Sequence, residues 1–253
     1  LLQFERIDQI ELPGLSIDRR PIIAGGVLVL EAAFETLGLE RMLVSKAAMR
    51  EGVLYDMIGR VGATDPRDAS VAALKKRYDM DMAQAQRVEA TALRLFDQVA
   101  ERWALGADER RMLAWAARVH ELGLAIAHSQ YHVHGAYILE YSDIAGFSRH
   151  EQRFLAALVR SHRRNVPKHA FDAVPDRLLV QAKRTAALLR LAVLLHRSHE
   201  AESIPKLEAK VDGDTLDIAL APRWLAARPL LRSDLDQELQ AIRGLGITLR
   251  IHA

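Results

Sequence analysis

The sequence predicts a mainly α-helical protein, in which an all-α domain follows a partial α/β segment and precedes a small ββαβ unit. Two observations support the helical part: apolar residues recur every three or four positions over long stretches of residues 63–203, and strand signals are rare there. A third observation supports the final unit, because residues 206–211 and 216–221 alternate strictly between apolar and polar side chains. With 253 residues, the chain can form more than one compact unit with a buried core.

Residues 1–62 are predicted to form the α/β segment. The stretch RRPIIAGG, residues 19–26, is interpreted as a short buried strand that runs into a glycine turn, and residues 27–38 follow at helical spacing. Residues 41–46 are expected to form a second strand and residues 47–60 a second helix. The order strand, helix, strand, helix indicates an α/β layer that is incomplete by itself.

Residues 63–203 are predicted to be the all-α domain. Gly62, Asp65 and Pro66 interrupt the chain where this domain begins. The helices that follow carry apolar stripes at helical spacing, which are expected to face one core. Three of these stripes consist of Val88, Ala92, Leu95, Val99 and Trp103; of Leu113, Ala117, His120 and Leu124; and of Ala182, Ala186, Leu189, Val193 and His196.

Residues 204–253 are predicted to be the small ββαβ unit. Its two alternating stretches are separated by the sequence Asp-Gly-Asp at residues 212–214, which is typical of an antiparallel hairpin. Residues 229–243 are expected to be helical, and residues 247–251 alternate as a last strand.

The composition excludes several classes of protein. The chain has no cysteine, which excludes disulfides, thiolate metal sites and thiol nucleophiles, and which fits a cytoplasmic location. The longest clean apolar stretch, residues 22–30, is too short to span a bilayer, so no membrane association is expected. The formal net charge is only +2, so nucleic acid is not an expected partner, and any polyanion would have to bind local basic clusters.

Three histidines on separate helices are candidates for a shared site. His120, His162 and His196 each fall on the apolar stripe of their own helix and are expected to point inward. Several converging imidazoles favour a metal or phosphate site over isolated core histidines. The helix of His120 lacks a second histidine four positions on, which excludes the zincin motif. His132 and His134, two positions apart, cannot share a helical face, and exposure is as consistent with their pattern as burial.

The helices also resemble an HD-type phosphohydrolase domain. The resemblance rests on QAQRVEATALRLF, AARVHELG, YHVHGAYIL and LRLAVLLHRSH in this order. HD domains hold a metal with a histidine, an adjacent His-Asp pair and a distant aspartate. Under this resemblance Gln84 stands at the first ligand position, His120 and Glu121 form the pair, and His196 replaces the last acid. A neutral amide is a poor ligand for a hard divalent ion. We therefore expect a vestigial site of Gln84, His120, Glu121, His162 and His196 that holds no metal.

A wider resemblance covers nearly the whole chain. Five blocks, MREGVLYDMIGR, HELG, YHVHGAYIL, AGFSRHEQ and LLRLAVLLHRSH, resemble the exopolyphosphatase and guanosine pentaphosphate phosphohydrolase family in content and order. This resemblance implies that residues 1–62 end an actin-like lobe, that residues 63–203 are an HD-like helical domain and that residues 204–253 are a C-terminal α+β unit. The family's glycine loops and catalytic glutamate precede these parts. We therefore expect a part of a longer protein that does not hydrolyse by itself.

For the complete protein, the resemblance implies removal of the terminal phosphate from inorganic polyphosphate, or of the 5′ phosphate from guanosine pentaphosphate, with Mg²⁺ assisting. No catalytic residue and no metal ligand is assigned to this chain, which is expected to grip polyanionic substrate, to form a homodimer, or both. Arg50 is expected to face the active cleft because a guanidinium can fork onto phosphate oxygens, although an ordinary ion pair is the alternative. The other candidates for substrate binding are Lys75, Lys76, Arg77, Arg163, Arg164 and Lys168.

Two alternatives stay open. A metal-dependent HD-type nucleotide phosphohydrolase draws on His120 and His196, and it predicts bound divalent metal and activity in this chain. A non-catalytic dimerisation or regulatory module draws on Gln84 and the missing acids, and it predicts neither. The quoted blocks are common to both activities of the family, so polyphosphate and guanosine pentaphosphate are both candidate substrates.

Overall fold

The computed structural model describes residues 3–4, 6–42, 65–200 and 204–252. The chain divides into two compact units, Leu1–Leu54 and Tyr55–Ala253. Each unit is described by itself below. The domain boundary predicted at residues 62 and 63 lies outside the described residues, as do Arg50, the predicted helix at residues 47–60 and most of the predicted strand at residues 41–46.

The first unit is helical where it is described. Its elements are η1 (Ile7–Gln9), η2 (Ile17–Arg19) and α1 (Arg20–Leu37). The strand predicted at residues 19–26 is wrong, because Arg19 ends η2 and the residues from Arg20 onward form the start of α1. Pro21 lies in the first turn, where its missing N–H removes no intrahelical hydrogen bond, and the chain continues in helical conformation through both glycines. The helix ends at Gly38, whose φ of 62° is the left-handed conformation that glycine favours.

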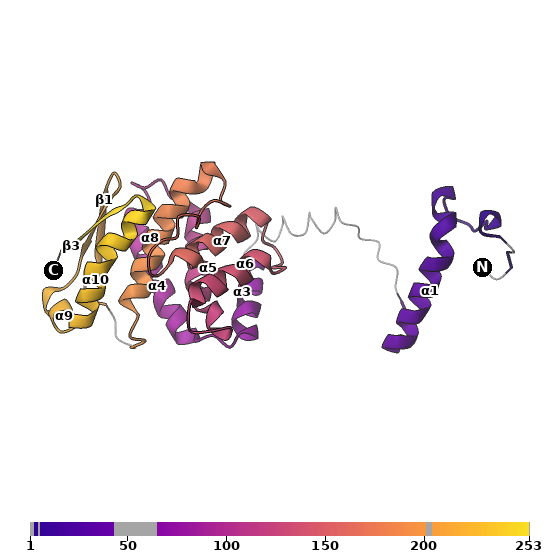
Figure 1. The fold of residues 1–253 in the computed structure, drawn as a ribbon, viewed down its shortest axis with the longest axis horizontal. Helices are drawn as coiled ribbons and strands as arrows, with labels where there is room; N and C mark the ends of the chain where they lie inside the picture. The colour runs from indigo at the N-terminus through magenta and orange to yellow at the C-terminus, as the bar shows by residue number, and fades with distance from the viewer. Residues whose placement is uncertain (1–2, 5, 43–64, 201–203, 253) are drawn as a thin grey trace. The chain divides into compact units, whose positions relative to one another are not determined.

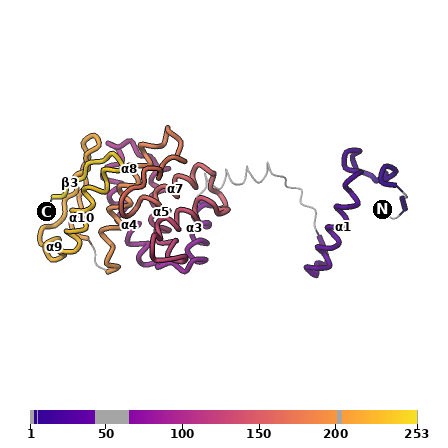
Figure 2. The backbone as a smooth tube through the Cα atoms, in the orientation of Figure 1, coloured from indigo at the N-terminus to yellow at the C-terminus, as the bar shows by residue number. Residues whose placement is uncertain are grey.

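The second unit is mainly helical and ends in a small sheet, as the sequence predicts (Figures 1 and 2). Its helices are α3 (Pro66–Arg77), α4 (Met82–Val99), α5 (Ala107–Val119), α6 (Tyr131–Tyr141), α7 (Arg149–Ser161), α8 (Leu179–Leu195), α9 (Pro222–Ala226) and α10 (Pro229–Ala241). Single 3-10 turns lie at η3 (Leu122–Ala125), η4 (Asp176–Leu178) and η5 (Ile242–Leu245). No described helix is long and apolar enough to cross a membrane.

The sheet has three strands in the order β1-β2-β3: β1 (Glu208–Asp212), β2 (Thr215–Ala219) and β3 (Thr248–His252). The predicted hairpin is confirmed, since β1 and β2 pair antiparallel around Gly213. The last strand is confirmed too, but it pairs parallel to β2, with Thr215 opposite Thr248. A parallel pair needs a crossover connection, which α9 and α10 supply together. The sequence analysis did not identify α9.

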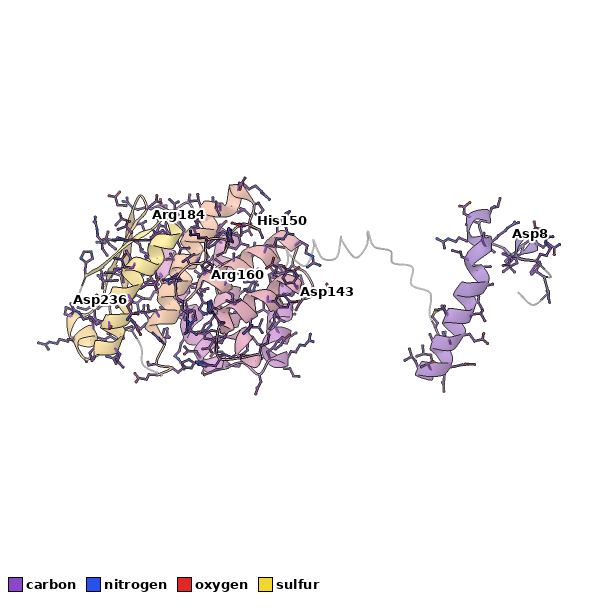
Figure 3. All side chains as sticks on the ribbon, viewed as in Figure 1. Asp8, Asp143, His150, Arg160, Arg184 and Asp236 are labelled. Carbon is purple, nitrogen blue, oxygen red and sulfur yellow. The ribbon has the colours of Figure 1, made fainter. Side chains whose placement is uncertain are left out.

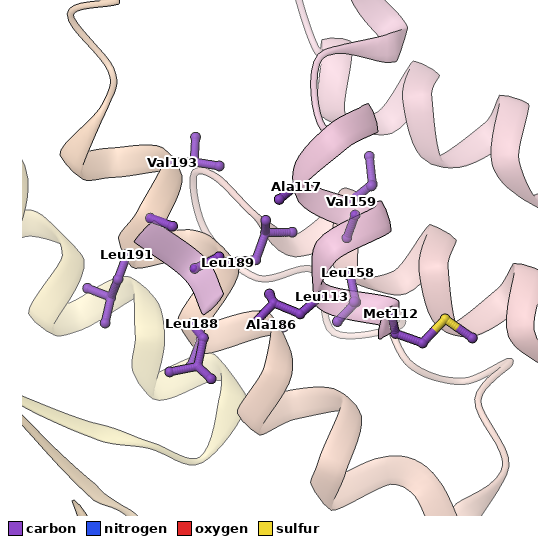
Figure 4. Packing of buried hydrophobic residues seen from close by; sticks show 14 of the residues in the cluster. Met112, Leu113, Ala117, Leu158, Val159, Ala186, Leu188, Leu189, Leu191 and Val193 are labelled. Atoms are coloured by element: carbon purple, nitrogen blue, oxygen red, sulfur yellow. The ribbon is translucent and has the colours of Figure 1, made fainter. Parts of the chain in front are cut away.

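One hydrophobic core runs through the second unit, from Val71 in α3 to Leu249 in β3. Its centre consists of fully buried residues of α5, α7 and α8, among them Leu113, Leu158 and Leu189 (Figure 4). Leu124, predicted on the stripe of Leu113, is 40% exposed instead. The reason is that α5 ends at Val119 and the chain then turns in η3.

Polar contacts fasten the hairpin to the helices. Arg184 of α8, labelled in Figure 3, donates hydrogen bonds to the Trp103 carbonyl (3.0 Å) and to Asp214 Oδ1 (3.1 Å). The Trp103 indole, itself buried, donates to the Gly213 carbonyl (3.0 Å). The helices and the sheet therefore share one core and a set of specific hydrogen bonds.

A buried ion pair joins α8 to α10. Arg190 donates from Nε to Glu238 Oε1 (2.5 Å) and from Nη2 to Oε2 (2.8 Å), with side chains that are 0% and 8% exposed. The guanidinium also donates to the carbonyl oxygens of Ser161 and Arg164, the latter at 2.7 Å. One side chain thus ties together the end of α7, the middle of α8 and α10.

Two glycines let η3 pack closely on α6. A Cβ atom added to Gly123 would lie 1.9 Å from the Tyr131 carbonyl oxygen and 2.5 Å from the Gly135 amide nitrogen. A Cβ atom added to Gly135 would lie 3.2 Å from a methyl group of Val159. Gly123, the glycine of the HELG stretch, is therefore required because the backbone of α6 approaches its own backbone so closely that no side chain fits.

We predict that Gly123→Ala lowers the free energy of unfolding by at least about 2 kcal/mol, because rigid backbone atoms must move to admit the methyl group. Urea unfolding followed by circular dichroism measures this loss. Gly106→Ala is the matched control, since its Cβ would meet only the flexible Glu109 side chain at 3.3 Å and should cost less. Equal losses in the two variants would contradict the role given to close packing.

Candidate functional site

Three histidine rings meet in the core of the second unit. His120 directly follows α5, His162 directly follows α7, and His132 lies in the first turn of α6. They are 0%, 2% and 3% exposed, respectively. The centre of the His162 ring lies 5.6 Å from that of His120 and 6.1 Å from that of His132, and it is nearly perpendicular to both. We call these three residues the histidine cluster. The burial of His132 corrects an expectation that left exposure open.

Hydrogen bonds fix the tautomer of two of these rings. His120 Nδ1 donates to the Ala117 carbonyl (2.8 Å), and His162 Nδ1 donates to the Val159 carbonyl (2.6 Å). A neutral imidazole with a proton on Nδ1 has a lone pair on Nε2. Both Nε2 atoms, and Nδ1 of His132, are buried with no hydrogen-bond partner among the described residues.

The histidine cluster is neutral at pH 7. Burial lowers the pKa of His120 to about 4, since desolvation disfavours the charged imidazolium. Burial, assisted by the positive charges of Arg163 and Arg164, lowers the pKa of His132 to about 4 as well. The pKa of His162 lies well below its usual value, again mainly because the ring is buried.

A second group of residues surrounds the end of α8. Gln84 donates from Nε2 to the backbone carbonyl of His196 (2.7 Å) and accepts from Arg87 Nη2 on its amide oxygen (2.9 Å). The His196 ring nitrogen Nε2 is 2.7 Å from the Thr91 hydroxyl. Burial lowers the pKa of His196 to about 4, so this ring is also neutral at pH 7.

Glu121 stands between the two groups. Its Oε1 atom lies 3.2 Å from Nε2 of His199 and 3.8 Å from Nε2 of His120. Burial raises the pKa of the Glu121 carboxyl group, while the neighbouring His199 acts in the opposite direction. His199 was not among the residues singled out from the sequence.

These residues do not fit a divalent metal. The amide oxygen of Gln84 is the one atom of this side chain that could bind a metal, and it already accepts a hydrogen bond from the positively charged Arg87 guanidinium. The His196 ring is hydrogen-bonded to the Thr91 hydroxyl. Within the described ranges, no group of three or more histidine, aspartate or glutamate side chains is arranged to hold a metal ion. Gln84 and His196 therefore link α4 to the end of α8, which argues against their use as metal ligands.

A cavity of about 280 Å³ opens beside the histidine cluster. It is lined by Tyr131, by His162 and by the residues that follow α7, together with parts of α8 and α10. Its charged lining residues are Arg163, Arg164, Arg190, Arg197, Asp234 and Glu238. We call it the arginine cavity.

The arginine cavity carries uncompensated positive charge. Glu238 is paired with Arg190, and Asp234 is paired with Arg197 at 2.7 Å. Arg163 and Arg164 have no ion-pair partner in the described part of the chain, and the Arg163 guanidinium lies over the Tyr131 ring, 4.5 Å from its centre. Two unneutralised guanidinium groups beside a concave surface favour an anionic ligand.

The remaining predicted binding residues do not line this cavity. Lys75 is buried, and burial lowers the pKa of its ammonium group. Lys76 is exposed at the end of α3, and the Arg77 guanidinium lies 5.5 Å from the centre of the next tyrosine ring. Lys168 lines a different cavity, of about 350 Å³. Only Arg163 and Arg164 of the predicted set share one cavity in the structure, and Arg50 lies outside the described residues.

Sequence reasoning missed Tyr131 and Arg190. Tyr131 carries no pattern that separates it from a core aromatic residue. Arg190 does carry a signal, because it is the one charged residue in the otherwise apolar stretch of residues 186–195. A charge at such a position must be buried with a partner, which the sequence does not identify.

Comparison with known proteins finds that two parts of the chain match models of one phosphatase family. A family model described as "Ppx/GppA phosphatase, domain III" matches residues 67–239, and one described as "Ppx/GppA phosphatase family" matches residues 1–61. The guanosine-5′-triphosphate,3′-diphosphate pyrophosphatases of Pseudoalteromonas translucida and Aeromonas hydrophila are 34% and 33% identical, over 252 and 250 residues. The alignments cover 99% and 97% of this chain but 50% of each relative, so the chain spans about half their length.

The depressed histidine pKa values predict a loss of stability in acid. The unfolded chain takes up protons near pH 6.5, whereas folded His120, His132 and His196 take them up only near pH 4. Stability is therefore complete above about pH 6.5 and falls as the pH approaches 4. Between about pH 7.5 and about pH 5, each of these histidines should contribute a loss of about 1–2 kcal/mol in the free energy of unfolding.

Urea unfolding at the two pH values, with His132→Gln and His150→Gln beside the wild type, measures this effect. His132→Gln should lose less stability on acidification than the wild type, because one titrating imidazole is gone. His150 is exposed on α7 (Figure 3), so its variant should behave like the wild type. An identical acid loss in all three proteins would contradict the assignment to His132.

Proposed function

The chain belongs to the Ppx/GppA phosphatase family, and on this premise we propose that it is the C-terminal part of a phosphoanhydride hydrolase. The complete enzyme would remove terminal phosphate from inorganic polyphosphate or the 5′ phosphate from guanosine pentaphosphate. The names of its relatives, which are pyrophosphatases of a guanosine triphosphate 3′-diphosphate, support the second substrate. We place bond cleavage, and the Mg²⁺ that would assist it, in a part of the enzyme outside this chain.

The arginine cavity is the observation that carries the role of this chain, which is to grip the polyanion. A polyphosphate carries about one negative charge per phosphate unit, so binding depends on cations that are not already neutralised. Arg163 and Arg164 meet this requirement. A guanidinium can form two parallel hydrogen bonds to one phosphate group, which fixes the orientation of the chain as well as attracting it.

The histidine cluster supports the grip without adding charge. Its rings are neutral, so they do not repel the arginines that follow His162 directly. The Arg190 guanidinium holds the carbonyl groups of Ser161 and Arg164, and thereby the backbone from which Arg163 and Arg164 project. The family's homodimer remains part of the proposal on the resemblance alone.

Polyphosphate binding by filter retention across a salt series tests the grip. The wild-type chain should bind, and the logarithm of the affinity should fall linearly with the logarithm of the salt concentration. The variant Arg163→Ala/Arg164→Ala should bind at least about tenfold more weakly, with a shallower slope because fewer counterions are released. Arg153→Ala/Arg177→Ala removes the same charge from two exposed positions outside the cavity and should bind like the wild type.

Equal weakening in the two double variants would mean that binding follows net charge rather than the cavity. Binding that neither variant weakens would place the grip elsewhere. Either result would contradict the role proposed for the arginine cavity.

A further inference from the structure

Two ion pairs join the chain around the end of α8 to α10. The Arg190–Glu238 pair is buried, with side chains that are 0% and 8% exposed. The Arg197–Asp234 pair lies at the surface, where Arg197 Nη1 donates to Asp234 Oδ1 (2.7 Å) and the side chains are 63% and 24% exposed. All four residues line the arginine cavity. One ion pair of this cavity is therefore fixed in the core, whereas the other meets solvent.

The two pairs differ in how readily a ligand can replace one partner. Separating the buried pair would leave an uncompensated charge in the core, which is strongly unfavourable. The exposed Arg197–Asp234 pair contributes little stability, because water and salt screen it and because both groups stay solvated when they separate. Arg197 is thus a cation that is paired in the free protein and that an anionic ligand can recruit.

Arg197 shares its surroundings with Arg163. Burial raises the pKa of the Tyr131 hydroxyl, whereas the positive charges of Arg163 and Arg197 act in the opposite direction, so both guanidinium groups lie near this hydroxyl. The Arg163 guanidinium also lies over the Tyr131 ring, and all three residues line the arginine cavity. An anion held by Arg163 therefore also experiences the positive charge of Arg197.

Asp234 occupies the place that an anionic ligand would take on Arg197. Carboxylate and phosphate groups both accept paired hydrogen bonds from a guanidinium, so they compete for the same N–H groups. A phosphate chain that Arg163 and Arg164 already hold presents its next phosphate at a high effective concentration, which favours the exchange. A ligand without a further phosphate lacks this advantage.

We propose that Asp234 is an internal competitor of the ligand and that Arg197 is a third phosphate-binding residue of the arginine cavity. A chain of three or more phosphates uses Arg163 and Arg164 for two of its groups and displaces Asp234 from Arg197 with another. A diphosphate has no further group and leaves the ion pair intact. The inference rests on the proposed function for the anion at Arg163 and Arg164, and it goes beyond that function in the selective role of the ion pair.

Tripolyphosphate and pyrophosphate are the probes, because they differ by one phosphate group. Isothermal titration of the whole chain should give at least about tenfold tighter binding for tripolyphosphate. The variant Arg197→Ala/Asp234→Asn removes the ion pair without changing the net charge. It should bind tripolyphosphate at least about fivefold more weakly than the wild type, while its affinity for pyrophosphate stays within about twofold.

Asp234→Asn alone should bind tripolyphosphate at least about threefold more tightly, because the Arg197 guanidinium is no longer occupied. Asp236→Asn removes the same charge from an exposed position of α10 outside the cavity and should bind like the wild type (Figure 3). The control for the double variant is Arg110→Ala/Asp97→Asn, which removes an exposed ion pair between α4 and α5 and is also neutral in charge.

An unchanged affinity of Arg197→Ala/Asp234→Asn for tripolyphosphate, or an equal loss for both probes, would overturn the inference while the grip of Arg163 and Arg164 stands. Equal affinities of Asp234→Asn and Asp236→Asn would overturn it too. Failure of the proposed function has a different signature. In that case Arg163→Ala/Arg164→Ala would bind pyrophosphate as the wild type does, and the inference would fall with it.

Discussion

The Arg190 guanidinium is the interaction on which the candidate site depends. It lies fully buried among helices, where an unpaired charge would be strongly destabilising, and it is matched by Glu238 and by two backbone carbonyl groups. Glu238 lies in α10, Ser161 is the last residue of α7 and Arg164 follows α7, whereas Arg190 itself lies in α8. The hydrogen bond from Arg190 to the Arg164 carbonyl fixes the backbone of Arg164, whose φ of 56° is in the left-handed region. The buried Arg190–Glu238 pair therefore joins α8 to α10, and both residues also line the arginine cavity.

The site separates buried neutral groups from cations at the surface. Desolvation keeps His120, His132 and His162 uncharged, so these three rings add no positive charge beside the arginines that follow α7. Two of the positions that the HD resemblance assigns to a metal site, Gln84 and His196, serve instead as hydrogen-bonding links between α4 and the end of α8. This separation is the basis of our proposal that the helical domain binds a polyanion without performing chemistry on it.

Periodicity was sufficient for much of the fold. The stripes of α4, α5 and α8 face the core, and the Asp-Gly-Asp turn joins two antiparallel strands, because these features are determined by local sequence. The predictions that were wrong concern positions where the local pattern suits more than one structure or where a helix ends earlier than its apolar stripe. The apolar run at residues 22–24 is short, so it suits a strand and a helix equally. Leu124 is exposed because α5 ends one turn earlier than its predicted stripe.

Less of the candidate site than of the fold could be predicted from the sequence. Spacing placed His120 and His162 on inward faces, but the burial of His132 and the partner of Arg190 depend on contacts between helices far apart in the chain. Of the basic residues, Lys75 is drawn into the protein, and only Arg163 and Arg164 remain together in one cavity. Charge clusters in a sequence do not reveal which of them is already neutralised in the fold.

The most direct test of this account is the affinity for tripolyphosphate of the variant Arg190→Met/Glu238→Leu. Replacing both partners by apolar side chains of similar size preserves packing and leaves no unpaired buried charge, so the variant should fold. Glu238→Gln, which weakens the pair while keeping its shape, is the second variant. The account predicts that both fold by circular dichroism and bind at least about tenfold and about threefold more weakly, respectively, because Arg163 and Arg164 lose their fixed positions. Wild-type affinity in both folded variants would contradict it.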